Sequence, residues 1–207
     1  MPRKNRPLER DTGVVRDANL IVIASEDQDA VKKYFAKFRT RRVQFRVLET
    51  TDGKGSPAAV LARLDEYQQE YSIGEDDQLW YCGDVDHWAK PDHIQVFLDV
   101  LKQCFDKGYE VAISNPCFEF WLLLHFSDHP VEEGLKCPAI GRLLSQAAGG
   151  YSKNVGCRSS ITAEMVHTAA ARAKALDTND HLIPDSYVTR VYLIIDALLS
   201  KQMIELG

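Results

Sequence analysis

The chain has 207 residues, of which 45% are apolar and 27% are charged, with a formal net charge of −5 and five cysteines. This composition is typical of globular proteins and predicts one or two compact domains whose core needs no disulfide or structural metal. The negative charge argues against a protein that coats nucleic acid through bulk positive charge, and the cysteines form no CxxC pair that would indicate a zinc ribbon.

The first 17 residues are predicted to be a basic tail. No apolar stretch follows its basic residues, so the tail does not have the pattern of a secretion signal. The longest apolar run, residues 118–126, is far shorter than the roughly 20 residues that a membrane span needs. We therefore expect a protein without a membrane span that stays in the cytoplasm. The basic residues of the tail are Arg3, Lys4, Arg6 and Arg10.

Strand-like and helix-like patterns alternate between residues 18 and 115. Residues 20–24 form a continuous apolar run, which is typical of a strand covered on both faces, whereas residues 43–48 alternate as a strand with one wetter face does. The order predicts an α/β core with a mainly parallel, four-stranded sheet flanked by helices. Further strands are predicted at residues 79–82 and 109–113, and helices at residues 31–38, 57–67 and 94–105.

The second half of the chain, residues 116–207, shows only helical patterns. We expect this half to be α-helical and to pack on the core as part of one compact unit, with no convincing strand after residue 116. Apolar stripes at helical spacing cover residues 118–126, 139–148, 161–176 and 187–203.

Acidic residues follow two of the predicted strands at the point where those strands end. Glu26 lies just after the first strand, and Asp84 and Asp86 follow the third. The carboxyl ends of parallel strands meet at one edge of a sheet, and carboxylates gathered there suit Mg²⁺ or Mn²⁺, which would offset their mutual repulsion. The alternative is structural, with Asp84 capping its own turn and Glu26 solvated. His87, next to these acids, is either a proton shuttle or a surface imidazole.

A cluster of arginines precedes and enters the second predicted strand. Because arginine side chains bind phosphates, this cluster is a candidate surface for the backbone of a nucleic acid or for a partner, and such binding would depend on salt. The plainer alternative is a solvated turn between a helix and a strand. The cluster comprises Arg39, Arg41, Arg42 and Arg46.

The fourth strand ends at an Asn-Pro pair with the composition of a helix start. Asn115 is a favoured N-cap residue, and Pro116 suits the first helical position, so we predict that a helix begins here on the wall of the acidic site. Glu119 would lie in its first turn. There Glu119 is either a fourth metal ligand, direct or through water, or a structural carboxylate that pairs with an arginine or caps its own helix.

The order of the acidic residues, with Glu after the first strand and Asp-x-Asp after the third, resembles that of Toprim domains. Dehalogenase-type phosphatases carry Asp-x-Asp after their first strand and response-regulator receivers carry an acidic pair there, so both differ from this chain. Residues 113–126, ISNPCFEFWLLLHF, are similar to the SNPxFExWLLLHF signature of the RloB family, which includes the abortive-infection protein AbiLii. Residues 151–154, YSKN, extend the similarity. Where that family commonly has Gly after the first Glu, this chain has Asp27.

The resemblance implies a prokaryotic anti-phage defence protein with metal-dependent nuclease activity on DNA or RNA, in some cases beside an ATPase partner protein. It implies Mg²⁺ or Mn²⁺ held by Glu26, Asp84 and Asp86, with Lys153 as a candidate phosphate contact. Two alternatives stay open: a non-catalytic nucleic-acid-binding or sensor subunit that regulates the ATPase, and a small-molecule phosphohydrolase. Metal dependence of phosphodiester cleavage separates the nuclease from the sensor subunit.

Overall fold

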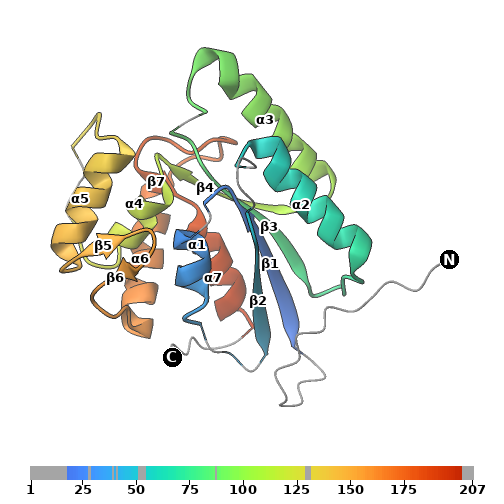
Figure 1. The fold of residues 1–207 in the computed structure, drawn as a ribbon, viewed down its shortest axis with the longest axis horizontal. Helices are drawn as coiled ribbons and strands as arrows, with labels where there is room; N and C mark the ends of the chain where they lie inside the picture. Colours follow the sequence, from blue (N-terminus) through green and yellow to red (C-terminus); the bar gives the residue numbers. More distant parts are fainter. Residues whose placement is uncertain are drawn as a thin grey trace.

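A five-stranded sheet forms the centre of the molecule (Figure 1). The computed structural model describes residues 18–201 except 28, 39, 41, 51–54, 87 and 129–131. Four strands are parallel, and β7 is antiparallel to β4, in the order β2-β1-β3-β4-β7. The prediction of a mainly parallel α/β sheet is confirmed. The strands are β1 (Asn19–Ser25), β2 (Val43–Leu48), β3 (Gln78–Asp84), β4 (Glu110–Asn115) and β7 (Val188–Thr189).

Helices cover both faces of the sheet (Figure 1). In β1, Ile21 and Ile23 pack into the core on one face, and Leu20 and Val22 pack into the core on the other. The run of residues 20–24 is apolar throughout because both of its faces are buried. No helix in the described part of the chain is long and apolar enough to cross a bilayer. One face carries α2 (Pro57–Glu70) and α3 (Pro91–Asp106), and the other side carries α1 (Ala30–Phe35), α4 (Phe118–Leu123), α5 (Cys137–Ala147), α6 (Ala163–Leu176) and α7 (Val191–Leu199).

The second half of the chain contains strands as well as helices, so the prediction that it is wholly helical is wrong. β7 lies inside the segment predicted as a helix over residues 187–203, and it adds a fifth strand to the predicted four. β5 (Tyr151–Ser152) and β6 (Gly156–Cys157) form a separate antiparallel hairpin. Two-residue strands are too short to show either alternation or an apolar run, and they form because a neighbouring segment supplies their hydrogen-bond partners.

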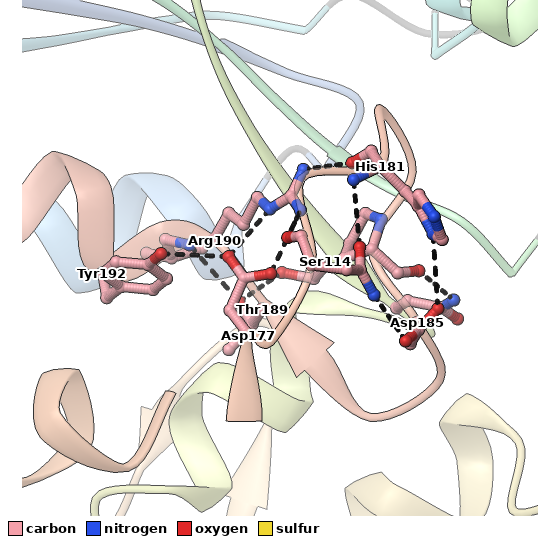
Figure 2. Close-up of polar contacts among 11 residues, drawn as sticks. Ser114, Asp177, His181, Asp185, Thr189, Arg190 and Tyr192 are labelled. Carbon is pink, nitrogen blue, oxygen red and sulfur yellow. Dashed lines mark hydrogen bonds and ion pairs between the residues drawn. The ribbon is translucent and has the colours of Figure 1, made fainter. Parts of the chain in front are cut away.

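Polar side chains fix β7 to the edge of the sheet (Figure 2). The hydroxyls of Ser114 on β4 and Thr189 on β7 are hydrogen-bonded at 2.8 Å. The Arg190 guanidinium donates to both carboxylate oxygens of Asp177, at 2.9 and 3.0 Å, and the Tyr192 hydroxyl donates to the same carboxylate. The Arg190 and Asp177 side chains are only 14% and 6% exposed. This ion pair is therefore largely shielded from solvent, and it holds the loop before β7 against the start of α7.

We expect Arg190→Ala to destabilise the protein by about 3–5 kcal/mol, because the buried Asp177 carboxylate loses its cation. Urea unfolding followed by circular dichroism measures the change. Lys174→Ala is the matched control, since the Lys174–Asp196 pair is longer, at 3.6 Å, and its side chains are 69% and 43% exposed. That control should stay within about 0.5 kcal/mol of wild type. Equal losses in the two variants would contradict the role given to the Arg190 pair.

A buried histidine, His125, follows α4 inside the aromatic core. Its Nδ1 lies 3.0 Å from the Trp121 carbonyl oxygen, and its Nε2 lies 3.0 Å from the Tyr34 hydroxyl. Because a carbonyl only accepts, Nδ1 carries the proton of the neutral ring and Nε2 accepts from Tyr34. Burial lowers the pKa of His125 to about 4, since the charged imidazolium would be poorly solvated here. The core therefore holds this ring in its neutral form.

The buried ring makes stability depend on pH. Between about pH 6.5 and pH 4 the unfolded chain binds a proton at His125 that the folded chain does not, so the free energy of unfolding should fall by about 3 kcal/mol as the pH drops through this window. His125→Gln should be less stable at pH 8, because it loses packing, and should show a smaller fall across the window. Urea titrations at several pH values test this. His167→Gln, which replaces an exposed histidine on α6, should keep the wild-type slope; an unchanged slope in His125→Gln would contradict the assignment.

Candidate functional site

A pocket of about 1210 Å³ opens where the parallel strands end. Loops after β1 and β3, the first turn of α4, the face of α5 and the β5–β6 hairpin all contribute to its wall. Such edges collect functional groups because the loops of adjacent parallel strands converge there. The charged residues of the wall are Glu26, Asp27, Asp29, Asp84, Asp86 and Glu119, together with Lys90, Arg142 and Lys153.

Glu26 joins the ends of β1 and β3. Its Oε1 accepts a 2.6 Å hydrogen bond from the backbone N–H of Asp84, and its Oε2 accepts a 3.1 Å hydrogen bond from the indole N–H of Trp88. β1 and β3 are neighbours in the sheet, so Glu26 and Asp84 leave the same edge side by side. The structure thus brings together two of the acids that the sequence analysis singled out, and it gives Glu26 a fixed orientation.

The Asp84 carboxyl has a strongly raised pKa in this position. Burial raises the pKa of its carboxyl well above the ordinary value, and the negative charges of Glu26 and Glu119 raise it further, with Lys153 acting in the opposite direction. The ionised form of this carboxyl is therefore disfavoured. An added positive charge close to Asp84 would favour that form.

Lys153 supplies positive charge from the β5–β6 hairpin. Its Nζ lies 2.9 Å from Asp27 Oδ2 and 3.3 Å from Glu119 Oε1. Burial alone would lower the pKa of Lys153, but the charges of Glu119 and Asp27 outweigh burial and raise it. The ammonium is thus an internal counter-ion of the acidic wall. The Tyr151 hydroxyl, on the same hairpin, donates a 3.1 Å hydrogen bond to Glu119.

The Asp27 carboxylate accepts three hydrogen bonds, two on one oxygen and one on the other. Oδ1 accepts the backbone N–H groups of Asp29 and Ala30 at the start of α1, at 2.8 and 2.5 Å, and Oδ2 accepts from Lys153. Burial opposes ionisation, but the hydrogen bond and charge of Lys153 together with these N–H groups lower the pKa of Asp27 below its usual value. Asp27 therefore caps α1 and anchors the hairpin at once.

The helix after β4 begins later than predicted. The prediction that Asn115 is its N-cap and Pro116 its first residue is wrong, because Cys117 is the N-cap and α4 starts at Phe118. The Asn115 side chain instead donates to the Pro184 carbonyl, and the Asn115–Pro116 peptide bond is cis. The Pro116 carbonyl accepts the backbone N–H groups of residues 85 and 86, both at 3.1 Å. The Pro116 carbonyl thus holds the Asp-x-Asp loop. Glu119 still falls in the first turn of α4, 4% exposed.

The carboxylates fit Mg²⁺ or Mn²⁺ in chemical type, because both cations take hard oxygen ligands. The raised pKa of Asp84 also marks a place where added positive charge would be stabilising. Within the described residues, however, no three His, Cys, Asp or Glu side chains are grouped around one point as a ligand set. Both oxygens of Glu26 point to N–H donors. The donor set is therefore suitable, and its side chains would have to turn to share one cation.

The arginine cluster lies apart from the pocket as far as it is described. Arg42 directly precedes β2 and is exposed at the amino end of the parallel strands, whereas the acids lie at the carboxyl end. Arg46 is exposed on β2, the edge strand, and neither side chain lines the pocket. The predicted residues that fall outside the described part of the chain are Arg39, Arg41, His87 and the basic residues of the tail.

Other residues of the wall were not predicted. Lys90 and His93 follow the Asp-x-Asp loop directly, so their closeness to the acids in the sequence was an available signal. No signal in the sequence indicated Arg142, because this residue reaches the pocket through the packing of α5 on α4. Tyr151 was noted within the YSKN segment, yet nothing local indicates that its hydroxyl contacts Glu119.

Fold and site together define an α/β protein with an acidic pocket at the carboxyl edge of a mainly parallel sheet. Residues 21–198 match the family described as RloB-like protein. The chain belongs to the RloB-like family. No curated protein and no solved structure gives a significant match to it.

We expect Lys153→Met to lower the free energy of unfolding by about 1–2 kcal/mol at pH 7.5, because Asp27 and Glu119 lose their counter-ion while solvent screens part of the loss. The loss should shrink near pH 4, because Asp27 without Lys153 loses the contact that lowers its pKa and takes up a proton there. Urea unfolding at both pH values measures it. Lys32→Met, which removes an exposed pair with Glu49, should change stability little at either pH. A loss for Lys153→Met that is equal at both pH values would contradict the counter-ion role.

Proposed function

We propose that this RloB-like protein is a Mg²⁺- or Mn²⁺-dependent nuclease of prokaryotic anti-phage defence, acting in the cytoplasm. The observation that supports the proposal most is the gathering of Glu26, Asp84 and Glu119 at one pocket, where burial, and then the negative charges of Glu26 and Glu119, raise the pKa of the Asp84 carboxyl. The association of the RloB-like family with defence and restriction-like functions supplies the biological setting. Phosphodiester cleavage is a chemistry in which a divalent cation and nearby cationic side chains act together on a phosphate.

The Toprim-like character is part of this proposal. Glu26 follows β1 and Asp84 ends β3, and these two strands are direct neighbours in the sheet. This is the placement of acids that the Toprim resemblance implies. Asp86 and Glu119 line the same pocket and would complete the ligand set, Glu119 directly or through water.

The bound cation would activate a water molecule and neutralise the scissile phosphate. Glu26, Asp84 and Asp86 would hold it. Lys153, which pairs with Asp27 and Glu119, would turn from Glu119 to a phosphate oxygen when positive charge is added beside that carboxylate. Lys90, at the start of α3, and Arg142, on α5, would bind the flanking phosphates. The rings of Trp88 and His93 lie 5.9 Å apart at the pocket and offer a surface on which an unpaired base can stack.

A second candidate is a non-catalytic nucleic-acid-binding or sensor subunit of an ATPase-associated defence system. The orientation of Glu26 favours it, because both of its carboxylate oxygens accept hydrogen bonds from Asp84 and Trp88. In this case the acids would be structural. Exposed Arg42, just before the edge strand β2, and exposed Arg46, within it, would then form a separate contact surface for nucleic acid or the ATPase.

Asp84→Asn should reduce cleavage at least 100-fold while the protein stays folded, because the cation loses one ligand charge and no core volume changes. The assay measures cleavage of plasmid DNA, single-stranded DNA and tRNA in the presence of Mg²⁺, Mn²⁺ or a chelator. Asp106→Asn, an exposed acid at the end of α3, is the matched control and should cleave like wild type.

Full activity of Asp84→Asn would remove this residue from the catalytic set. Wild-type protein that binds these substrates but cleaves none of them with either metal would favour the sensor subunit. Melting curves of all three proteins show whether any loss of cleavage comes from unfolding.

A further inference from the structure

Gly141 is an unusual residue for its position in α5. The helix runs from Cys137 to Ala147, so Gly141 lies inside it, and within the described part of the chain no other glycine is helical. A glycine inside a helix is less stable there than alanine, because it loses more backbone freedom on folding and adds no side chain to pack. Glycine at this position therefore carries a cost that alanine would avoid.

Neither backbone conformation nor packing requires glycine at residue 141. Gly108 and other glycines that follow helices or form turns have positive φ, but Gly141 does not. A Cβ built on Gly83 would lie 2.7 Å from the Tyr81 ring, whereas a Cβ built on Gly141 would have no atom of the described residues within 4 Å. The cost of this glycine is thus not offset by a contact inside the described structure.

The open side of Gly141 belongs to the acidic pocket. Gly141 and Arg142 both line the pocket, whereas the buried residues of α5 are Ile140 and Leu144. The space that a side chain at residue 141 would fill is therefore space of the pocket. Because the peptide groups inside a helix are hydrogen-bonded to each other, Gly141 offers a ligand close van der Waals approach to the helix rather than a free hydrogen-bonding group.

We propose that Gly141 is the point at which the sugar–phosphate backbone of the substrate strand lies against α5, and that the missing side chain admits the strand there. This inference rests on the proposed nuclease function and specifies the path of the substrate through the pocket. Arg142, the next residue, would bind a phosphate of the same stretch. A side chain at residue 141 would hold the strand away from the helix and lengthen that contact.

Stability and binding should then change in opposite directions. Gly141→Ala should raise the melting temperature by about 2–4 °C, because alanine is the better helix former. The same change should weaken strand binding at least about 5-fold, since the added methyl group overlaps the contact surface. Gly141→Leu should melt no lower than wild type, because leucine is also a strong helix former, and should weaken binding more than Gly141→Ala.

Fluorescence anisotropy of a short labelled single strand, as DNA and as RNA, measures binding to the full chain. Ca²⁺ replaces Mg²⁺ in this assay to slow cleavage, and a gel shows that the strand stays intact. Ala147→Leu is the matched control, because it adds bulk at an exposed residue of α5 that does not line the pocket. This control should bind both strands like wild type. Melting curves of all four proteins give the stability.

The outcomes separate this inference from the proposed function. Equal binding by wild type, Gly141→Ala and Gly141→Leu would overturn the inference and leave the proposed function standing. Wild-type protein that binds neither strand would refute the proposed function and the inference with it. Gly141 variants that melt lower than wild type, or an equal loss of binding in Ala147→Leu, would show that residue 141 supports the helix and not the substrate.

Discussion

The repulsion among carboxylates at one edge of the sheet is the constraint on which the rest of the site depends. Parallel pairing of β1 with β3 forces Glu26 and Asp84 to leave the sheet side by side, and α4 adds Glu119 beside them. Each negative charge needs compensation in a partly buried pocket. Backbone N–H groups, the Trp88 indole and the Lys153 ammonium supply it in the described structure.

The β5–β6 hairpin is therefore part of the site although it lies outside the central sheet. In the described part of the chain its two strands pair only with each other, so contacts of its side chains and backbone with other elements dock it. Lys153 binds Asp27 and Glu119, Tyr151 binds Glu119, and Lys33 on α1 donates to the Lys153 carbonyl. The acids thus position the hairpin as much as the hairpin neutralises the acids. Loss of either partner would loosen the other.

The sequence predicted those features that arise from local pattern. Residues 20–24 were predictable as a strand because burial on both faces leaves an unbroken apolar run, and Glu26 and Asp84 were predictable neighbours because strand order fixes the edge at which they emerge. β7 was not predictable, since its two residues carry no pattern, and it is held by the contact of Thr189 with Ser114 on β4 and by the ion pair between Arg190 and Asp177. Asn115 and Pro116 have the composition of a helix start, so the sequence alone predicted one. Their actual partners are far away in the sequence: the Asn115 side chain contacts Pro184, and the Pro116 carbonyl contacts the loop after β3.

Asp27 gives the Lys153 ammonium a carboxylate partner besides Glu119. The resemblance described above implies glycine at this position, which would leave Lys153 with Glu119 alone, whereas here Asp27 gives the ammonium a second carboxylate at 2.9 Å. Under the proposed function a divalent cation and Lys153 draw on the same group of carboxylates. Because Asp27 retains Lys153 without taking it out of the pocket, the ammonium can release Glu119 and stay close to a bound phosphate. The residue that departs from the family pattern would thus keep the counter-ion near the reacting group and leave Glu119 open to the cation.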